Sequence, residues 1–116
     1  MDLEQVREYC LRKAGATEST PFGVDVLVFK VAGKMFALAA LDEIPATVNL
    51  KCDPDLALAL RDRYEQVQPG YHMNKKHWNT VTADGSLSMT LLKEMIDDSY
   101  DLIVQSLPKK ERDSLL

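Results

Sequence analysis

The first 15 residues show the apolar spacing of an amphipathic helix. The apolar residues that recur at intervals of three or four are Leu3, Val6, Cys10 and Ala14. Asp2 precedes them and Gln5 follows three residues later, which is the arrangement of an N-terminal capping box. The pattern therefore predicts a helix that begins after Asp2 and ends before Gly15.

Three segments with the two-residue period of β-strands follow. VDVLVFKV at 24–31 is rich in β-branched residues, and an Ala32-Gly33 turn joins it to a second strand at 34–40. The third strand, at 46–52, places Ala46, Val48, Leu50 and Cys52 on one side and Thr47, Asn49 and Lys51 on the other. We expect the three strands to pair antiparallel, with Leu50 buried and Asn49 facing away from the core.

The second half of the chain adds three helices and one strand. Asp53 caps a helix that Pro54 opens. Its inward side is expected to hold Leu56, Leu60 and Tyr64. A strand is expected at 79–82, then a long amphipathic helix from Ser88 that ends before Pro108, and a short terminal helix. Since no repeat or linker interrupts the pattern, the sequence predicts one α+β domain, an antiparallel sheet flanked by helices, over all 116 residues.

Composition narrows the class of protein. Apolar residues make up 46% and charged residues 28%, as in ordinary globular proteins. The net charge of −4 argues against a protein that coats nucleic acid, but it allows a local basic patch. The chain has neither the long apolar run of a membrane helix nor the apolar core of a signal peptide. We therefore expect a cytoplasmic protein without a membrane partner, as a monomer or, alternatively, a homodimer.

Side chains that carry catalysis or bind metals lack the neighbours that these functions require. His72 and His77 are five residues apart, whereas helical zinc pairs are three or four apart. Cys10 and Cys52 fall on apolar faces and are expected to be buried thiols, without the surroundings of an activated nucleophile. The five glycines are too scattered for a phosphate-binding loop. We expect no enzymatic activity, no cofactor and no metal.

One segment, QPGYHMNKKHWNT at 68–80, departs from the acidic balance of the chain. It contains no acid, and it combines Lys75 and Lys76 with two histidines and two aromatic residues. Lysine and histidine can contact phosphate, and aromatic rings can stack on bases. The structural alternative is that Asn74 caps a one-turn helix while Trp78 packs against the core. From the residues alone, both interpretations stay open.

Three segments resemble the MmcQ/YjbR family of small bacterial proteins. They are PFGVDVLVFKVAGKMFAL at 21–38, VNLKCDPDLALALR at 48–61 and PGYHMNKKHWNTV at 69–81. The resemblance runs in order over nearly the whole chain. It implies an α+β sheet flanked by helices, similar to secretion chaperones and to the frataxin-like, double-wing architecture. It also implies DNA binding, since that fold presents a pair of β-hairpin wings.

The resemblance also defines a candidate nucleic-acid or anion site. Its residues are Lys51, His72, Asn74, Lys75, Lys76, His77, Trp78 and Asn79. In the leading hypothesis the lysines contact the phosphates of double-stranded DNA and a hairpin such as 24–40 enters a groove. The alternatives are a protein-interaction domain of secretion-chaperone type and a pocket for a small anion. A positive stripe would favour DNA, convergent lysines an anion, and an exposed apolar patch a protein partner.

Overall fold

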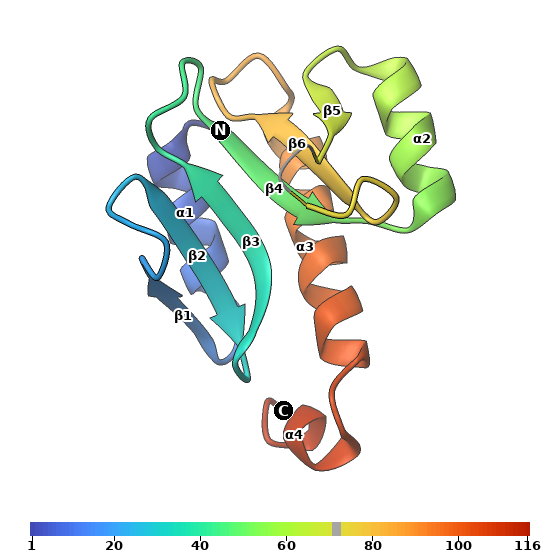
Figure 1. The fold of residues 1–116 in the computed structure, drawn as a ribbon. Coiled ribbons are helices and arrows are strands. Elements are labelled where there is room, and N and C mark those ends of the chain that lie inside the picture. The colour runs from blue at the N-terminus through green and yellow to red at the C-terminus, as the bar shows by residue number, and fades with distance from the viewer. Residues whose placement is uncertain (71–72) are drawn as a thin grey trace.

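The computed structural model describes residues 1–70 and 73–116, which form the helices and strands in Figure 1. In chain order they are α1 Leu3–Leu11, β1 Ala16–Ser19, β2 Val26–Val31, β3 Lys34–Ala40, β4 Thr47–Lys51, α2 Pro54–Arg63, β5 Val67–Pro69, β6 Trp78–Thr82, α3 Met89–Gln105 and α4 Lys109–Asp113. Each predicted element is present. The sequence pattern missed β1 and β5, which at four and three residues are too short to show a period.

All the strands form a single antiparallel sheet in the order β1-β2-β3-β4-β6-β5. The three strands predicted to pair antiparallel are neighbours near its centre, which confirms that expectation. The turn between β2 and β3 has positive φ at both Ala32 (49°) and Gly33 (78°), as two-residue hairpins whose twist matches the strands require. The missed strands are the edges of the sheet.

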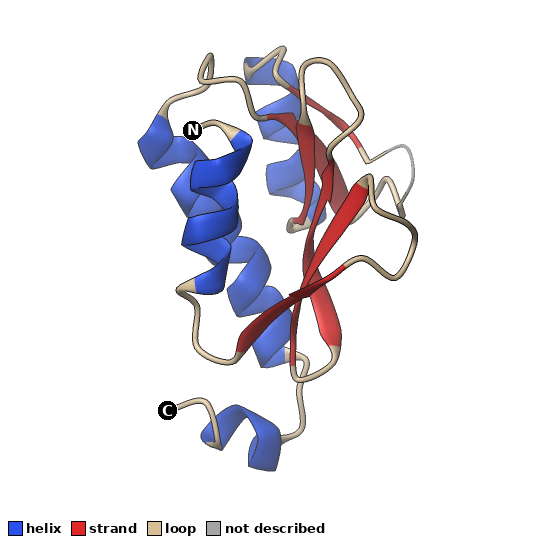
Figure 2. Cartoon of the chain, turned by 90° about the vertical axis from the view of Figure 1, so that its left-hand side faces the viewer, coloured by secondary structure: helices blue, strands red, loops and turns tan. Residues whose placement is uncertain are grey.

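Helices α1 and α3 lie on one face of the sheet, and α2 lies beside its β5 edge (Figures 1 and 2). The core between α1, α3 and the sheet includes Val6, Phe29, Phe36, Val48, Leu50, Leu92 and Ile96. Leu50 is 2% exposed and Val48 is fully buried, as predicted. The opposite face carries no helix in the part of the chain that the structure describes. Among these same residues, no helix is long and apolar enough to cross a membrane.

Side-chain caps define where the long helices begin. The Asp2 carboxylate accepts a hydrogen bond from the Gln5 amide at 2.9 Å, and the Gln5 side chain accepts one from the Asp2 amide at 3.0 Å. Asp53 and Ser88 cap α2 and α3 by accepting backbone amide hydrogen bonds, without the reciprocal side-chain bond. These contacts confirm the predicted capping residues, so local sequence determines the helix starts.

Asn49 points away from the helices, as predicted, but it is 1% exposed and so is not part of a solvated face. Its Oδ1 accepts a hydrogen bond from Thr80 Oγ1 at 2.7 Å, and its Nδ2 donates to the Leu38 carbonyl at 3.5 Å. Neighbouring strands therefore supply the partners that a buried amide requires.

Ser99 of α3 bridges two strands where their pairing stops. The pairing of β3 with β4 ends at Ala37 and Leu50. Beyond that pair, the Ser99 hydroxyl donates to the Phe36 carbonyl at 2.5 Å and accepts from the Lys51 amide at 2.9 Å. A fully buried side chain thus takes the place of a strand-to-strand hydrogen bond and attaches α3 to the end of β4.

Candidate functional site

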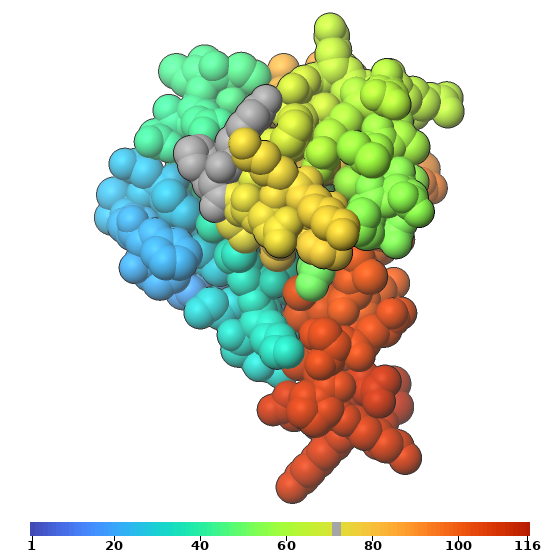
Figure 3. All heavy atoms as spheres, turned by 45° about the vertical axis from the view of Figure 1, so that its right-hand side comes forward, coloured from blue at the N-terminus to red at the C-terminus, as the bar shows by residue number. Residues whose placement is uncertain are grey.

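Residues 74–77 form a turn immediately before β6. The Asn74 side chain accepts a hydrogen bond from the Lys76 amide at 2.9 Å, and the Asn74 carbonyl accepts from the amides of His77 and Trp78 at 3.1 and 2.9 Å. Asn74 therefore caps the turn, as the structural alternative expects. Lys75 and Lys76 are exposed on it, and Figure 3 shows this part of the chain, in yellow, at the surface beside α2 in green.

Arg61 of α2 donates hydrogen bonds to the backbone of this turn. Its guanidinium donates to the Trp78 carbonyl at 3.2 Å and also to the Lys75 carbonyl. Its Nε donates to Asn79 Oδ1 at 2.7 Å. Several donors in a fixed planar arrangement allow one arginine to organise three acceptors. The geometry of the turn therefore depends on a residue from a different element.

Arg61 was not predicted as a site residue, although its position on the inward side of α2 indicates a partly buried side chain. The inward side of α2 holds Ala57, Leu60, Arg61 and Tyr64, whereas Leu56, expected there, is 42% exposed. Arg61 follows the buried Ala57 by four residues, so it lies on the same helix face. A charge on the packed side of a helix indicates a hydrogen-bonded partner in the interior.

Asn79 and Trp78 are interior residues rather than exposed site residues. Asn79 is 2% exposed, and its Nδ2 donates to the Ala57 carbonyl at 3.5 Å. Trp78 is 9% exposed, so its ring offers little area for stacking on a base. A Cβ at Gly70 would lie 2.8 Å from the Trp78 carbonyl oxygen, so only glycine allows the chain to pass so close.

The remaining basic residues of the predicted site meet at one end of the sheet. Lys51, the last residue of β4, pairs with Trp78 on β6, and the Cys52 amide donates to the His77 carbonyl at 2.7 Å. Lys51 and His77 are half-buried. Tertiary structure therefore brings the β4 end to the 74–77 turn. His72, the other predicted site residue, lies outside the described residues.

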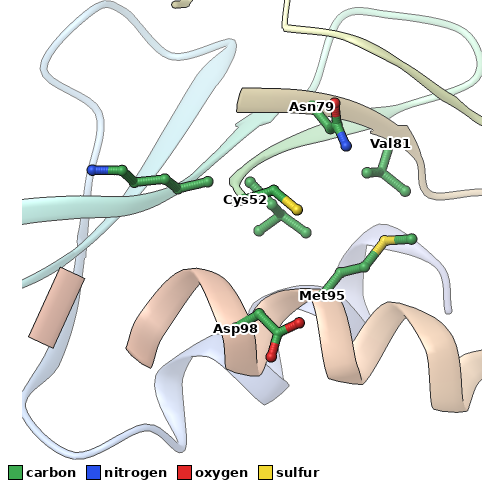
Figure 4. A pocket seen from close by; sticks show the side chains of 7 residues that line it. Cys52, Asn79, Val81, Met95 and Asp98 are labelled. Atoms are coloured by element: carbon green, nitrogen blue, oxygen red, sulfur yellow. The ribbon is translucent and has the colours of Figure 1, made fainter. Parts of the chain in front are cut away.

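The helix side of this region is acidic and tightly packed. A cavity of about 10 Å³ lies between the sheet and α3, with Cys52, Met95 and Asp98 in its lining (Figure 4). Desolvation, followed by repulsion from Asp101 and Asp97, raises the pKa of the Asp98 carboxyl above its ordinary value. The cavity has room for about one water molecule and not for an organic anion.

In the four cavities described for residues 1–70 and 73–116, lysines do not converge, and convergence is the feature that would favour a small-anion pocket. Each of the four cavities that we describe there has at most one lysine in its lining. In the same residues, histidine, cysteine, aspartate and glutamate form no group of three or more that could hold a metal ion. Lys75 and Lys76 therefore lie at the surface and line none of these four cavities.

Cys10 and Cys52 are free thiols and both are buried. Burial raises the pKa of the Cys10 thiol to about 12. Burial, followed by the negative charges of Asp98 and Asp53, raises the pKa of the Cys52 thiol to about 11. Because the thiolate is the reactive form, neither thiol is primed to act as a nucleophile at neutral pH.

We expect iodoacetamide at about pH 8 to leave both cysteines unmodified in the folded protein, because the thiolate fraction is on the order of 0.1% or less. Denaturation without a reductant should make both available, as counted by mass spectrometry. Free glutathione in the same tube controls for reagent activity. A denatured, unreduced protein that takes up no label would contradict free thiols.

The relatives of this chain fall in one family. The sequence model of the YjbR family matches residues 11–102. The protein YbdF of Escherichia coli O157:H7 is 43% identical over 93 residues, which cover 79% of this chain and 75% of that protein. The protein YjbR of Escherichia coli K12 is 35% identical over 116 residues, which cover 100% of this chain and 98% of that protein.

Solved structures show the same fold. The crystal structure of Deinococcus radiodurans protein DR2400, with a DUF419 domain, superposes with a TM-score of 0.91 at 37% identity, covering 98% of this chain and 87% of that one. A crystal structure of a Pseudomonas syringae protein gives 0.78 at 30% identity, covering 88% and 98%. On sequence and on fold, the chain belongs to the YjbR family.

Proposed function

We propose that this domain is a non-enzymatic module that binds DNA through its phosphate backbone. Lys51, Lys75 and Lys76 are the proposed phosphate contacts, and His77 adds a positive charge when it is protonated. The observation that carries the proposal is the turn at 74–77, whose backbone is hydrogen-bonded to Arg61 while Lys75 and Lys76 lie at the surface. A preorganised turn loses little conformational freedom on binding.

The absence of acidic residues around the 74–77 turn supports this location of the DNA contact, although the chain as a whole is acidic. From residue 66 to residue 83 the chain contains no acid, and Arg61 adds a permanent positive charge behind the turn. Phosphate contacts act over short range at physiological salt, so a local patch suffices for weak binding. Such contacts fix position on the duplex without reading its sequence.

The β2–β3 hairpin is a less suitable contact than the turn. Both of its strands are paired on both sides, β2 with β1 and β3 with β4. The body of the hairpin is therefore held within the sheet and does not project as a separate wing. For this reason we assign the DNA contact to residues 74–77 and the end of β4, and not to a projecting wing.

Replacing Lys75 and Lys76 together with alanine is expected to weaken DNA binding and its salt dependence. Three phosphate contacts predict a slope of about −2.7 for log affinity against log salt, which is roughly a 40-fold loss between about 50 and 200 mM. The double variant should make the slope of log affinity against log salt less negative by about two units. Fluorescence anisotropy with a labelled 20-base-pair duplex, about two helical turns, measures both quantities.

Lys109 and Lys110 provide the matched control. They are also adjacent exposed lysines, but they lie on α4. Their double alanine variant removes the same charge and should leave the slope nearly unchanged. Equal effects of the two double variants would indicate a response to net charge alone. If the wild-type domain does not bind the duplex at about 50 mM salt, the DNA proposal is wrong.

A further inference from the structure

The face of the sheet opposite α1 and α3 carries a groove of about 640 Å³, the largest of the four cavities described for residues 1–70 and 73–116. Its floor is apolar and comes mainly from Val26, Met35, Leu38 and Ala40 on β2 and β3. Phe22 and Met73 also line it, from the loops before β2 and before β6. The groove uses none of the residues proposed to contact DNA.

The loops beside the groove add exposed apolar surface. The Leu41 amide donates to the Asp25 carbonyl at 2.8 Å, so the loops before β2 and after β3 lie side by side. They expose Phe22 by 70%, Val24 by 81% and Ile44 by 98%. Large apolar side chains gathered on adjacent loops beside an apolar groove are typical of a surface that binds another molecule.

The polar groups of the groove are distributed unevenly. Asp42 and Glu43 follow directly after β3, so the Ala40 end of the groove is negative. Among residues 1–70 and 73–116, no lysine or arginine lines the groove. Asn49, which is 1% exposed, also lines the groove. Its side chain is already bonded to Leu38 and Thr80 of the neighbouring strands, so the floor of the groove is mainly apolar.

The length of the floor indicates the shape of the occupant. From Met35 to Ala40 the floor follows β3 for five residue steps, roughly 17 Å at about 3.3 Å per step. An extended peptide of five or six residues has this length. In such a peptide alternate side chains point to one face, so two apolar side chains can enter the groove.

We propose that this groove binds a short extended segment of a partner protein. The segment is apolar at two alternate positions and carries lysine or arginine at the end that lies next to Asp42 and Glu43. Methionine side chains at 35 and 73 adapt to apolar residues of different shape, so the apolar positions tolerate several residue types. This second binding surface is independent of the DNA proposal.

Selection from a phage library of random seven-residue peptides on the immobilised full chain tests this proposal. We expect enriched peptides to share two apolar residues separated by one position, with lysine or arginine within three residues on one side. Synthetic peptides from the enriched set are then measured by anisotropy. Phe22→Ser should weaken binding about 10-fold or more, since it removes an aromatic anchor. Asp42→Asn combined with Glu43→Gln should weaken it about two- to fivefold at low salt.

Two control variants separate the groove from other surfaces. Leu58→Ser removes a side chain that is 57% exposed on α2, outside the groove lining, and should leave peptide affinity unchanged. The Lys75/Lys76 double alanine variant should also bind the peptides normally. Circular dichroism of each variant establishes that it is folded. Because Phe22 is an exposed loop residue, its replacement should not affect folding.

Three outcomes would overturn the proposal. One is enrichment of no peptide. Another is enrichment of peptides without the basic residue, or of peptides that bind the Phe22→Ser variant as well as the wild type. The third is a dimer in analytical ultracentrifugation that Phe22→Ser converts to a monomer, because the occupant of the groove would then be a second copy of this chain.

Discussion

Replacing Asn79 with alanine should lower the free energy of unfolding by about 3 kcal/mol, because it removes the buried acceptor of a charged hydrogen bond. Asn79 is 2% exposed, and its Oδ1 accepts a hydrogen bond from the Arg61 Nε at 2.7 Å. Without it, the half-buried guanidinium loses one of its acceptors while it remains charged. Urea denaturation followed by circular dichroism measures the change.

A double-mutant cycle with Arg61→Ala isolates the pair. If the two side chains act as one unit, the double variant should be destabilised by much less than the sum of the single variants. Arg63→Ala is the control, since Arg63 is exposed on the same helix and its guanidinium lies over the Tyr64 ring, so its loss should change stability by less than about 1 kcal/mol. Additive effects of Asn79→Ala and Arg61→Ala would contradict the coupling.

The same cycle has a local readout at the turn. Arg61 binds the carbonyls of Lys75 and Trp78, so its loss should release the 74–77 backbone before the rest of the fold. Hydrogen exchange of the His77 amide, which donates to Asn74, should then accelerate more than that of amides in the β2–β3 ladder. Uniform acceleration would instead indicate a purely global loss of stability.

Replacing Ser99 with alanine should lower the free energy of unfolding by about 2–4 kcal/mol, because two buried backbone groups lose their partner at once. The hydroxyl serves both the Phe36 carbonyl and the Lys51 amide, at 2.5 and 2.9 Å. Alanine is close to serine in volume, so the packing of α3 on the sheet changes little. The loss therefore reports hydrogen bonding rather than a cavity.

Ser106→Ala is the matched control for Ser99→Ala. Ser106 ends α3 and is exposed; its hydroxyl donates to the nearby Ile103 carbonyl and accepts from the exposed Lys34 Nζ at 3.5 Å. Its replacement should change stability by no more than about 0.5 kcal/mol. Ser99→Ala with a similarly small effect would show that water replaces the hydroxyl between the two strands, and the bridge would then not be important for stability.

Much of the fold was predictable from local pattern. The capping residues Asp2, Asp53 and Ser88 determine helix starts because their side chains bond backbone amides only two or three residues away. The central strands were predictable because one side of each must be buried, which imposes the two-residue period. The edge strands β1 and β5 were not, because segments of four and three residues are too short to show that period.

In the candidate site too, the local contacts were predictable from the sequence and the contacts with distant elements were not. That Asn74 caps a turn with Lys75 and Lys76 on it was visible in NKKH, since the contacts are local. That Trp78 and Asn79 are buried rather than exposed depended on the strand β4 and the helix α2 that pack around them. Arg61 could be recognised as a structural residue only when its three acceptors were known.

By itself, the sequence determined the helix starts, the central antiparallel strands, the capped turn and the family, because each depends on neighbours within a few residues or on matched motifs. Only the tertiary structure decided which polar side chains are buried. Asn49, Asn79 and Ser99 look like ordinary surface residues in the sequence, yet all three are buried. The physical reason is that a buried polar group needs a partner, and these partners lie on strands and helices that only the folded chain brings together.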